Sequence, residues 1–144
     1  WFFSSSNPTI TFGGFEGEGK KEMYDQLPPG SFPKSLFISH NLAVERILKL
    51  TEENRIDFPF AVKPDVGKMG LMFRRINSQQ DLKTYHAKIQ CDYIIQEWIN
   101  DPLEVSVFYY RFPNMQKGTI TGFVRKDLLE VTGDGTSTLS ELIL

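Results

Sequence analysis

A lysine that ends an apolar stretch and is followed by a glycine-bearing loop is the first candidate for chemistry in this chain. The stretch Phe60–Pro64 predicts a strand, Lys63 lies near its end, and Gly67 and Gly70 lie in the loop that follows. A lysine ammonium can neutralise a phosphate as a point charge, and glycines let backbone N–H groups approach phosphate oxygens. The order of these residues favours a polyphosphate site. An ordinary hairpin loop after a strand fits the same residues, so both interpretations remain open at this point.

Two other nucleotide-binding patterns can be set aside. Residues Gly14–Lys20 match the pattern G-x-x-x-x-G-K. However, Lys21 follows where that loop needs Ser or Thr for magnesium, and Glu16 and Glu18 would place negative charge in the phosphate cradle. We therefore predict a glycine-rich surface turn in this segment. A protein kinase is excluded because its glycine-rich loop precedes the strand lysine, whereas the glycines here follow Lys63.

Hydrophobic periodicity and turn residues predict a mixed order of helices and strands. The predicted strands cover residues 34–38, 60–64, 71–76, 92–99, 103–112 and 119–130, and the predicted helices cover residues 20–27 and 41–53 and follow Ser78 and Thr138. Thr138 and Glu141 have the spacing of a capping box. Because neighbouring strands are joined as hairpins, an α+β fold with antiparallel or mixed sheets and flanking helices is favoured over a doubly wound parallel sheet.

The composition limits the classes of protein to which this chain can belong. With 144 residues, 40% of them hydrophobic, the chain can bury one proper core. Sixteen Lys and Arg against eighteen Asp and Glu give a net charge of −2, which argues against a nucleic-acid partner. The single cysteine, Cys91, excludes an internal disulfide framework, and no apolar run reaches the roughly 18 residues of a membrane span. We therefore expect a cytoplasmic protein with neither a nucleic-acid nor a membrane partner.

Two stretches downstream of Lys63 extend the pattern around the lysine. Residues Ile94–Ile99 form a predicted strand that ends in Gln-Glu-Trp-Ile, and Glu104 follows it. Residues Val131–Ile143 match the pattern V-x-G-D-G-x-x-T-[IL]-x-E-L-I. With these elements in this order, the chain resembles the ATP-grasp family of carboxylate–amine ligases. It is similar to D-alanine–D-alanine ligases in the first stretch and to cyanophycin synthetases in the second, and the resemblance covers residues 58–144.

The resemblance implies an ATP-grasp-like α+β fold in three parts. Residues 1–57 would form an irregular N-terminal segment with a lead-in helix, and residues 58–99 would form the first lobe of the ATP-grasp domain. Residues 100–144 would begin the second lobe, which the chain contains only in part. Because the chain begins with Trp1 rather than Met and ends within a predicted helix, we expect a fragment of a longer protein.

The resemblance also implies which residues bind ATP. In this family a strand lysine neutralises the phosphates, a flexible loop covers them, a hinge holds the adenine, and an acidic residue holds the ribose hydroxyls. The corresponding residues here are Lys63 for the phosphates, Asp65, Gly67, Lys68 and Gly70 in the loop, Gln96, Glu97, Trp98 and Ile99 in the hinge, and Glu104 at the ribose. The residues themselves favour a core position for Trp98. They leave Lys68 and Glu97 open between a nucleotide contact and solvent.

The implied activity is that of an ATP-dependent ligase. In this family a carboxylate is phosphorylated by ATP, and an amine attacks the resulting acylphosphate. ATP and magnesium are the implied cofactors. The magnesium ligands would lie outside this chain, so the fragment by itself is expected not to turn over. The donor and acceptor substrates do not follow from the sequence, and the formation of a homodimer stays open. The alternative is a nucleotide-binding or interaction module that lacks catalysis.

Overall fold

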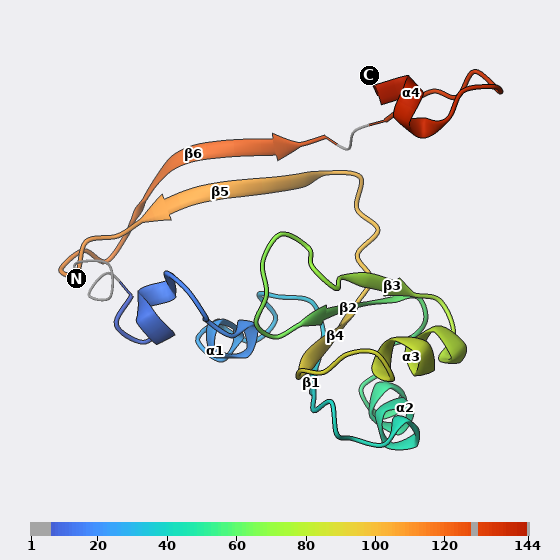
Figure 1. Ribbon diagram of the computed structural model, residues 1–144. Helices are drawn as coiled ribbons and strands as arrows, with labels where there is room; N and C mark the ends of the chain where they lie inside the picture. Colours follow the sequence, from blue (N-terminus) through green and yellow to red (C-terminus); the bar gives the residue numbers. More distant parts are fainter. Residues whose placement is uncertain (1–6, 128–129, 144) are drawn as a thin grey trace. The chain divides into compact units, whose positions relative to one another are not determined.

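The part of the chain that this computed structural model describes, residues 7–127 and 130–143, divides into two units. The first unit extends to Ile99 and the second begins at Asn100. Each unit has a sheet of its own, as the strand arrows in Figure 1 show. The strand lysine and the loop that follows it therefore belong entirely to the first unit.

The first unit is built on a four-stranded antiparallel sheet. Its strands are β1 (Ser35–Ile38), β2 (Phe60–Pro64), β3 (Arg74–Ile76) and β4 (Tyr93–Glu97). Their order in the sheet is β1-β4-β2-β3, and each neighbouring pair is antiparallel. Because β4 lies between β1 and β2, side chains from three distant parts of the sequence become neighbours across the sheet.

Two helices cover one face of this sheet. Figure 1 shows α2 (Val44–Glu53) and α3 (Gln79–His86) together on that side, and Ser78 caps α3 by accepting a hydrogen bond from the Asp81 N–H at 3.2 Å. The core between the helices and the sheet includes Ile38, Ile47, Phe60, Val62, Ile76, Leu82, Tyr85, Tyr93 and Ile95. Since side chains alternate along a strand, the residues between these core positions, Lys63 among them, face the other side of the sheet.

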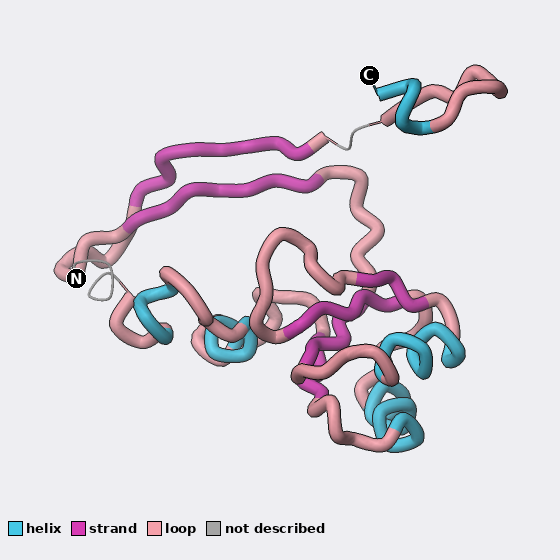
Figure 2. The backbone as a smooth tube through the Cα atoms, viewed as in Figure 1, coloured by secondary structure: helices cyan, strands magenta, loops and turns pink. Residues whose placement is uncertain are grey.

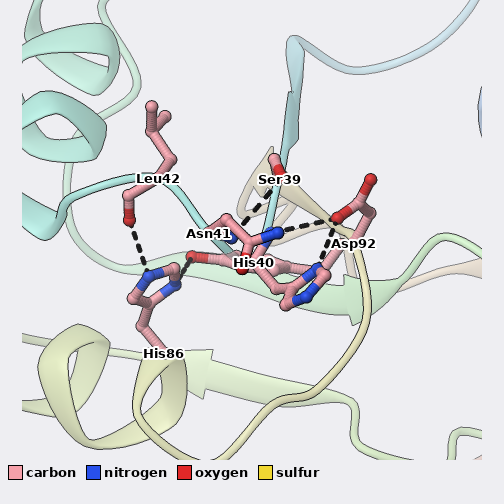
Figure 3. A network of polar contacts seen from close by, with 7 residues as sticks. Ser39, His40, Asn41, Leu42, His86 and Asp92 are labelled. Carbon is pink, nitrogen blue, oxygen red and sulfur yellow. Dashed lines mark hydrogen bonds and ion pairs between the residues drawn. The ribbon is translucent and has the colours of Figure 1, made fainter.

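The connection between β1 and α2 is held by two histidines, which Figure 3 shows from close by. Nε2 of His86 donates to the carbonyl oxygen of Leu42 at 2.8 Å, and Nδ1 of the same ring lies 3.0 Å from the Tyr93 hydroxyl. Because a carbonyl oxygen only accepts, Nε2 carries a proton, and in the neutral ring Nδ1 then accepts from the hydroxyl. His40 donates to Asp92 through its backbone N–H at 3.0 Å and pairs with it through Nδ1 at 2.8 Å. These contacts with His40 lower the pKa of Asp92.

The second unit begins with a two-stranded antiparallel hairpin. Its strands are β5 (Glu104–Tyr110) and β6 (Thr119–Lys126). The sequence predicts that the second strand extends over residues 119–130; residues 128 and 129 lie outside the described residues. Apolar side chains of both strands are exposed, including Val105, Val107, Phe108, Tyr109, Ile120, Phe123 and Val124. A two-stranded hairpin of this kind is at best marginally stable by itself.

A short helix, α4 (Leu139–Ile143), closes the described part of the second unit. The Glu141 carboxylate accepts hydrogen bonds from the backbone N–H of Thr138 at 2.7 Å and from its hydroxyl at 2.8 Å. These bonds lower the pKa of Glu141. One of the two bonds of the predicted capping box is therefore present, while the Glu141 N–H donates to the Thr138 carbonyl oxygen rather than to its side chain.

The α+β class with antiparallel sheets and flanking helices is confirmed. The hairpin of β2 and β3 is also confirmed, but its second strand is shorter than the predicted segment 71–76 and begins only at Arg74. Met69, Gly70 and Met72 have φ angles of 56°, 71° and 58°. Such positive values are incompatible with an extended strand, so the loop after β2 is longer than the sequence predicts.

Candidate functional site

Lys63 lies on the face of the sheet opposite α2 and α3. Its ammonium donates hydrogen bonds to Oε1 of Gln96 at 2.9 Å and to the hydroxyl of Tyr24 at 3.1 Å. The same ammonium lies 5.6 Å from the centre of the Tyr24 ring, within cation–π range. Both partners are neutral, so they orient the ammonium without cancelling its charge.

Gln96 is itself held in one orientation. In the strand register it lies opposite Ser35 on β1 and opposite Ala61 on β2. Its Nε2 donates to the Ser35 hydroxyl oxygen at 2.8 Å and to the Tyr24 hydroxyl oxygen at 3.2 Å. Because the amide nitrogen is directed to these two acceptors, the amide oxygen is left facing Lys63.

A second lysine, Lys20, reaches the same part of the first unit. It is the first residue of α1 (Lys20–Tyr24), and its ammonium donates to the carbonyl oxygens of Pro64, Asp65 and Gly67 at 3.0, 2.9 and 3.2 Å. Burial lowers the pKa of Lys20, and the nearby positive charge of Lys63 lowers it further. This lysine therefore lies at the exit of β2 rather than on a separate surface turn.

Asp65 joins the start of α1 to the end of β2. Its Oδ1 accepts the backbone N–H of Lys21 at 2.8 Å, and its carbonyl oxygen accepts the backbone N–H of Lys20 at 3.1 Å. The approach is close at Gly19, where an added Cβ would lie 2.8 Å from Oδ2 of Asp65. The carboxylate that the sequence predicts for nucleotide binding thus positions Lys20 and the beginning of the loop.

The loop between β2 and β3 is drawn in Figure 2 as one long connection without regular structure. Two turns form within it, with hydrogen bonds from the Leu71 N–H to the Lys68 carbonyl at 3.1 Å and from the Phe73 N–H to the Gly70 carbonyl at 3.0 Å. The side chain of Met69, within the first of these turns, is fully exposed. The loop therefore presents backbone and glycine beside the two lysines.

A cavity of about 270 Å³ lies between this loop and the lysines. It is lined by Lys20, Lys63, Pro64, Gly67, Lys68, Met69, Gly70, Leu71 and Phe73. Among the described residues, neither Lys20 nor Lys63 forms an ion pair with a carboxylate. The hydrogen bonds of both ammonium groups go to neutral atoms, and the carboxylates of Asp65 and Glu18 act on Lys20 only from beyond ion-pair distance. Two such ammonium groups beside a glycine loop are suited to bind an anion that carries several charges.

The predicted hinge residues follow Gln96 at the end of β4. Glu97 lies opposite Phe60 in the register and accepts the Lys34 N–H at 2.9 Å, so its side chain belongs to the face opposite Lys63. The Arg75 guanidinium lies over the Trp98 ring, 4.7 Å from the centre of that ring. The centres of the Trp98 and Phe73 rings are 6.4 Å apart. Ile99 is half exposed. The ring of Trp98 thus lies beside Phe73, which also lines the cavity.

Glu104 belongs to the second unit, at the start of β5. It forms an ion pair with Lys126 on β6, the residue opposite it in the strand register. Its predicted contact with a ribose therefore remains a prediction.

The sequence missed two residues of this site, Lys20 and Tyr24. In the sequence, Lys20 is the last residue of a glycine-rich pattern that does not fit a phosphate loop and the first residue of a predicted helix. Its contacts with residues 64–67 and the contact of Tyr24 with Lys63 link positions that are about 40 residues apart. Only folding reveals such contacts, although Lys20 and Tyr24 do lie on consecutive turns of one predicted helix.

Comparisons with known proteins support the fold. No protein-family model and no curated protein matches the chain. Solved structures do match, among them the crystal structure of N5-carboxyaminoimidazole synthetase from Staphylococcus aureus in complex with ADP. The TM-score is 0.54 with 22% sequence identity over 77% of this chain. That synthetase is an ATP-grasp enzyme. The fold of this chain is ATP-grasp-like.

The ATP-grasp-like match spans only part of the synthetase, since it covers 28% of that chain. Within the described residues of the present chain, no group of three or more His, Cys, Asp or Glu is placed to hold a metal ion. No described helix is both long enough and apolar enough to cross a membrane. The described residues thus contain a candidate anion site but no candidate metal site.

Proposed function

We propose that this chain binds the phosphates of an adenine nucleotide and is part of an ATP-dependent carboxylate–amine ligase. The observation that carries the proposal is the pair of lysines, Lys20 and Lys63, which line one cavity beside a glycine loop and form no ion pair with a carboxylate among the described residues. The ATP-grasp-like fold, and the ADP in the matched synthetase, support a nucleotide as the anion.

The nucleotide phosphates fit the chemistry of these residues. An anion between the two ammonium groups would relieve the mutual repulsion that contributes to the lowered pKa of Lys20. Gly67 and Gly70 allow the loop backbone to come close to phosphate oxygens. In the proposal, Lys63 and Lys20 neutralise the phosphates, Lys68 and the loop cover them, and Asp65 positions the loop.

The base and the ribose would be bound by the end of β4 and by residues that follow it. We assign the adenine to the segment from Gln96 to Ile99, where the Trp98 ring and the neighbouring Phe73 ring offer an apolar surface. We assign the ribose hydroxyls to Glu104. In this assignment residues 58–99 belong to the first lobe of an ATP-grasp domain and residues from 100 onward begin the second. Magnesium would take its ligands from outside the described residues.

In the proposed ligase, ATP supplies a phosphoryl group that activates a carboxylate for attack by an amine. The residues of this chain would position the phosphates and stabilise the negative charge on them, which is most of what a protein contributes to phosphoryl transfer. The complete reaction would be tested as ADP release by a longer protein that contains this chain, with carboxylates and amines supplied in pairs. Nucleotide binding without ADP release would favour the non-catalytic nucleotide-binding module.

The binding proposal is tested by titrating the isotope-labelled chain with ADP and following backbone amide signals by NMR, which detects weak complexes. A charged hydrogen bond contributes about 1.5–3 kcal/mol, so we expect Lys63→Met to raise the Kd for ADP by roughly 10- to 100-fold. We expect Lys20→Met to weaken binding as well. Lys83→Met is the matched control, because Lys83 is an exposed residue of α3 on the other side of the sheet.

Three results would separate the alternatives. If the wild-type chain does not bind ADP, the nucleotide proposal is wrong. If Lys83→Met weakens binding as much as Lys63→Met does, the effect comes from net charge and not from the cavity. If Lys20→Met leaves the affinity unchanged while Lys63→Met reduces it, Lys20 has only its structural contacts with the loop.

A further inference from the structure

We infer that Tyr24 is a positioning residue that holds the Lys63 ammonium in place for phosphate binding. Tyr24 ends α1, and its hydroxyl oxygen accepts hydrogen bonds from Lys63 at 3.1 Å and from Nε2 of Gln96 at 3.2 Å. Neither the strand-lysine pattern nor the glycine loop involves this tyrosine. The inference rests on the proposed nucleotide site and adds a residue that acts on it through Lys63.

The tyrosine ring is fixed before any nucleotide arrives. It stacks on Phe32 with ring centres 4.7 Å apart and an interplanar angle of 22°. It also meets the edge of Phe37 on β1 with ring centres 6.1 Å apart. Aromatic pairs at such separations are stabilising beyond the area that they bury. The hydroxyl of Tyr24 is therefore held over Lys63 by the packing of its own ring.

The hydrogen bonds around Lys63 form a network that links it to Ser35, Gln96 and Tyr24. The Ser35 hydroxyl donates to the Pro33 carbonyl at 2.8 Å and accepts from Gln96 at 2.8 Å, which fixes the Gln96 amide. Gln96 and Tyr24 then accept two of the three ammonium N–H groups of Lys63. Among the described residues no acceptor is found for the third N–H, and Lys63 lines the cavity, so this N–H remains available for a phosphate oxygen.

This arrangement predicts that Tyr24 and Gln96 assist phosphate binding by Lys63 rather than compete with the phosphate for the ammonium. A phosphate that takes the third N–H displaces neither Gln96 nor Tyr24, so it meets an ammonium whose rotamer entropy has already been lost. Without the Tyr24 hydroxyl, the Lys63 ammonium would keep only the Gln96 amide oxygen as an acceptor. The Gln96 amide nitrogen would keep only the Ser35 hydroxyl. The ammonium would then sample more orientations, and phosphate binding would have to select one of them.

The test is Tyr24→Phe, which keeps the ring and removes only the hydroxyl. Because the lost interaction is a single hydrogen bond, we expect the Kd for ADP to rise about 3- to 10-fold, with the Kd for adenosine unchanged. In the Lys63→Met background, Tyr24→Phe should change ADP affinity no further, since the tyrosine acts through Lys63. Tyr85→Phe is the matched control on the other face of the sheet and should leave ADP binding as it is in the wild type.

The outcomes distinguish this inference from the proposed function. If the wild-type chain binds ADP and responds to Lys63→Met but not to Tyr24→Phe, the inference is wrong and the nucleotide site stands. Tighter ADP binding by Tyr24→Phe would show that the Tyr24 hydroxyl competes with the phosphate for Lys63, and it would overturn the inference too. Equal losses for ADP and adenosine, or an undiminished loss in the Lys63→Met background, would assign Tyr24 a purely structural role. If the wild-type chain does not bind ADP, the inference fails together with the proposed function.

Discussion

Two tyrosines of the core should respond in opposite directions to the same substitution. Tyr85 on α3 and Tyr93 on β4 are both buried, and their rings meet edge to face with centres 5.3 Å apart. The Tyr93 hydroxyl donates to Nδ1 of His86 at 3.0 Å. The Tyr85 hydroxyl is buried and has no hydrogen-bond partner among the described residues. Removing the hydroxyl therefore deletes a hydrogen-bonded group at Tyr93 and a group without a hydrogen bond at Tyr85.

The expected magnitudes follow from the cost of burying polar groups. A buried hydroxyl without a partner costs about 1–3 kcal/mol, so Tyr85→Phe should raise the free energy of unfolding by about 1 kcal/mol. Tyr93→Phe removes a hydrogen bond and leaves Nδ1 of His86 without its donor, so it should lower the free energy of unfolding by about 1–2 kcal/mol. For a unit of this size, a change of 1 kcal/mol shifts Tm by roughly 4–8 °C.

The assay is urea unfolding of the 144-residue chain followed by far-UV circular dichroism, with Tm measured in parallel. Because both substitutions leave the aromatic rings in place, packing changes little and the hydroxyl dominates the difference. The reasoning is refuted if Tyr85→Phe destabilises the chain as much as Tyr93→Phe does. That result would mean that the Tyr85 hydroxyl is satisfied in solution, for example by a buried water.

Two further predictions concern pH and a close backbone contact. Burial raises the pKa of Tyr85 to about 12 from its ordinary value of 10.0 and raises the pKa of Tyr93 as well. Since the folded state holds these protons more tightly than the unfolded state, the stability that the two tyrosines contribute should be constant below about pH 10 and fall between about pH 10 and 12. The fall should be less steep in Tyr85→Phe, as urea midpoints across that range would show. In Gly19→Ala the new Cβ would displace the Asp65 carboxylate from α1, so we expect a loss of about 1 kcal/mol of stability and weaker ADP binding. Gly133→Ala, with open space around the new Cβ, is its control, and equal effects of the two substitutions would contradict the role of the contact.

Much of the fold was predictable because it depends on local patterns. The strand Phe60–Pro64 was predicted from consecutive apolar residues and matches β2. The helix starts at Ser78 and Thr138 were predicted from nearby residues: Ser78 accepts the Asp81 N–H as a cap should, and the Thr138 N–H donates to Glu141 in one of the two bonds of the predicted capping box. The boundaries were predicted less well. The loop after β2 runs on to Phe73 because of positive φ angles at two methionines, Met69 and Met72, residues that give no sequence signal for that conformation.

The candidate site was predictable only in the residues that lie next to one another in the chain. Lys63 and the glycines after it form a recognisable local pattern, and Gln96 was found by resemblance. Lys20 was set aside because Lys21 and the acidic residues before it do not fit a phosphate loop. That argument concerned the local loop alone, and it could not anticipate that α1 would pack against the end of β2.

The sequence by itself determined which residues carry charge, where the chain can turn tightly, and which stretches can be buried. These properties depend on residue type and on neighbours a few positions away. Only the tertiary structure decided that Lys63 and Gln96 share one face of the sheet and that α1 brings Lys20 and Tyr24 to them. The antiparallel order β1-β4-β2-β3 makes β2 and β4 neighbours, and it is set by the burial of residues spread over about sixty positions of the chain. Two lysines of an otherwise balanced sequence thereby become one cationic site.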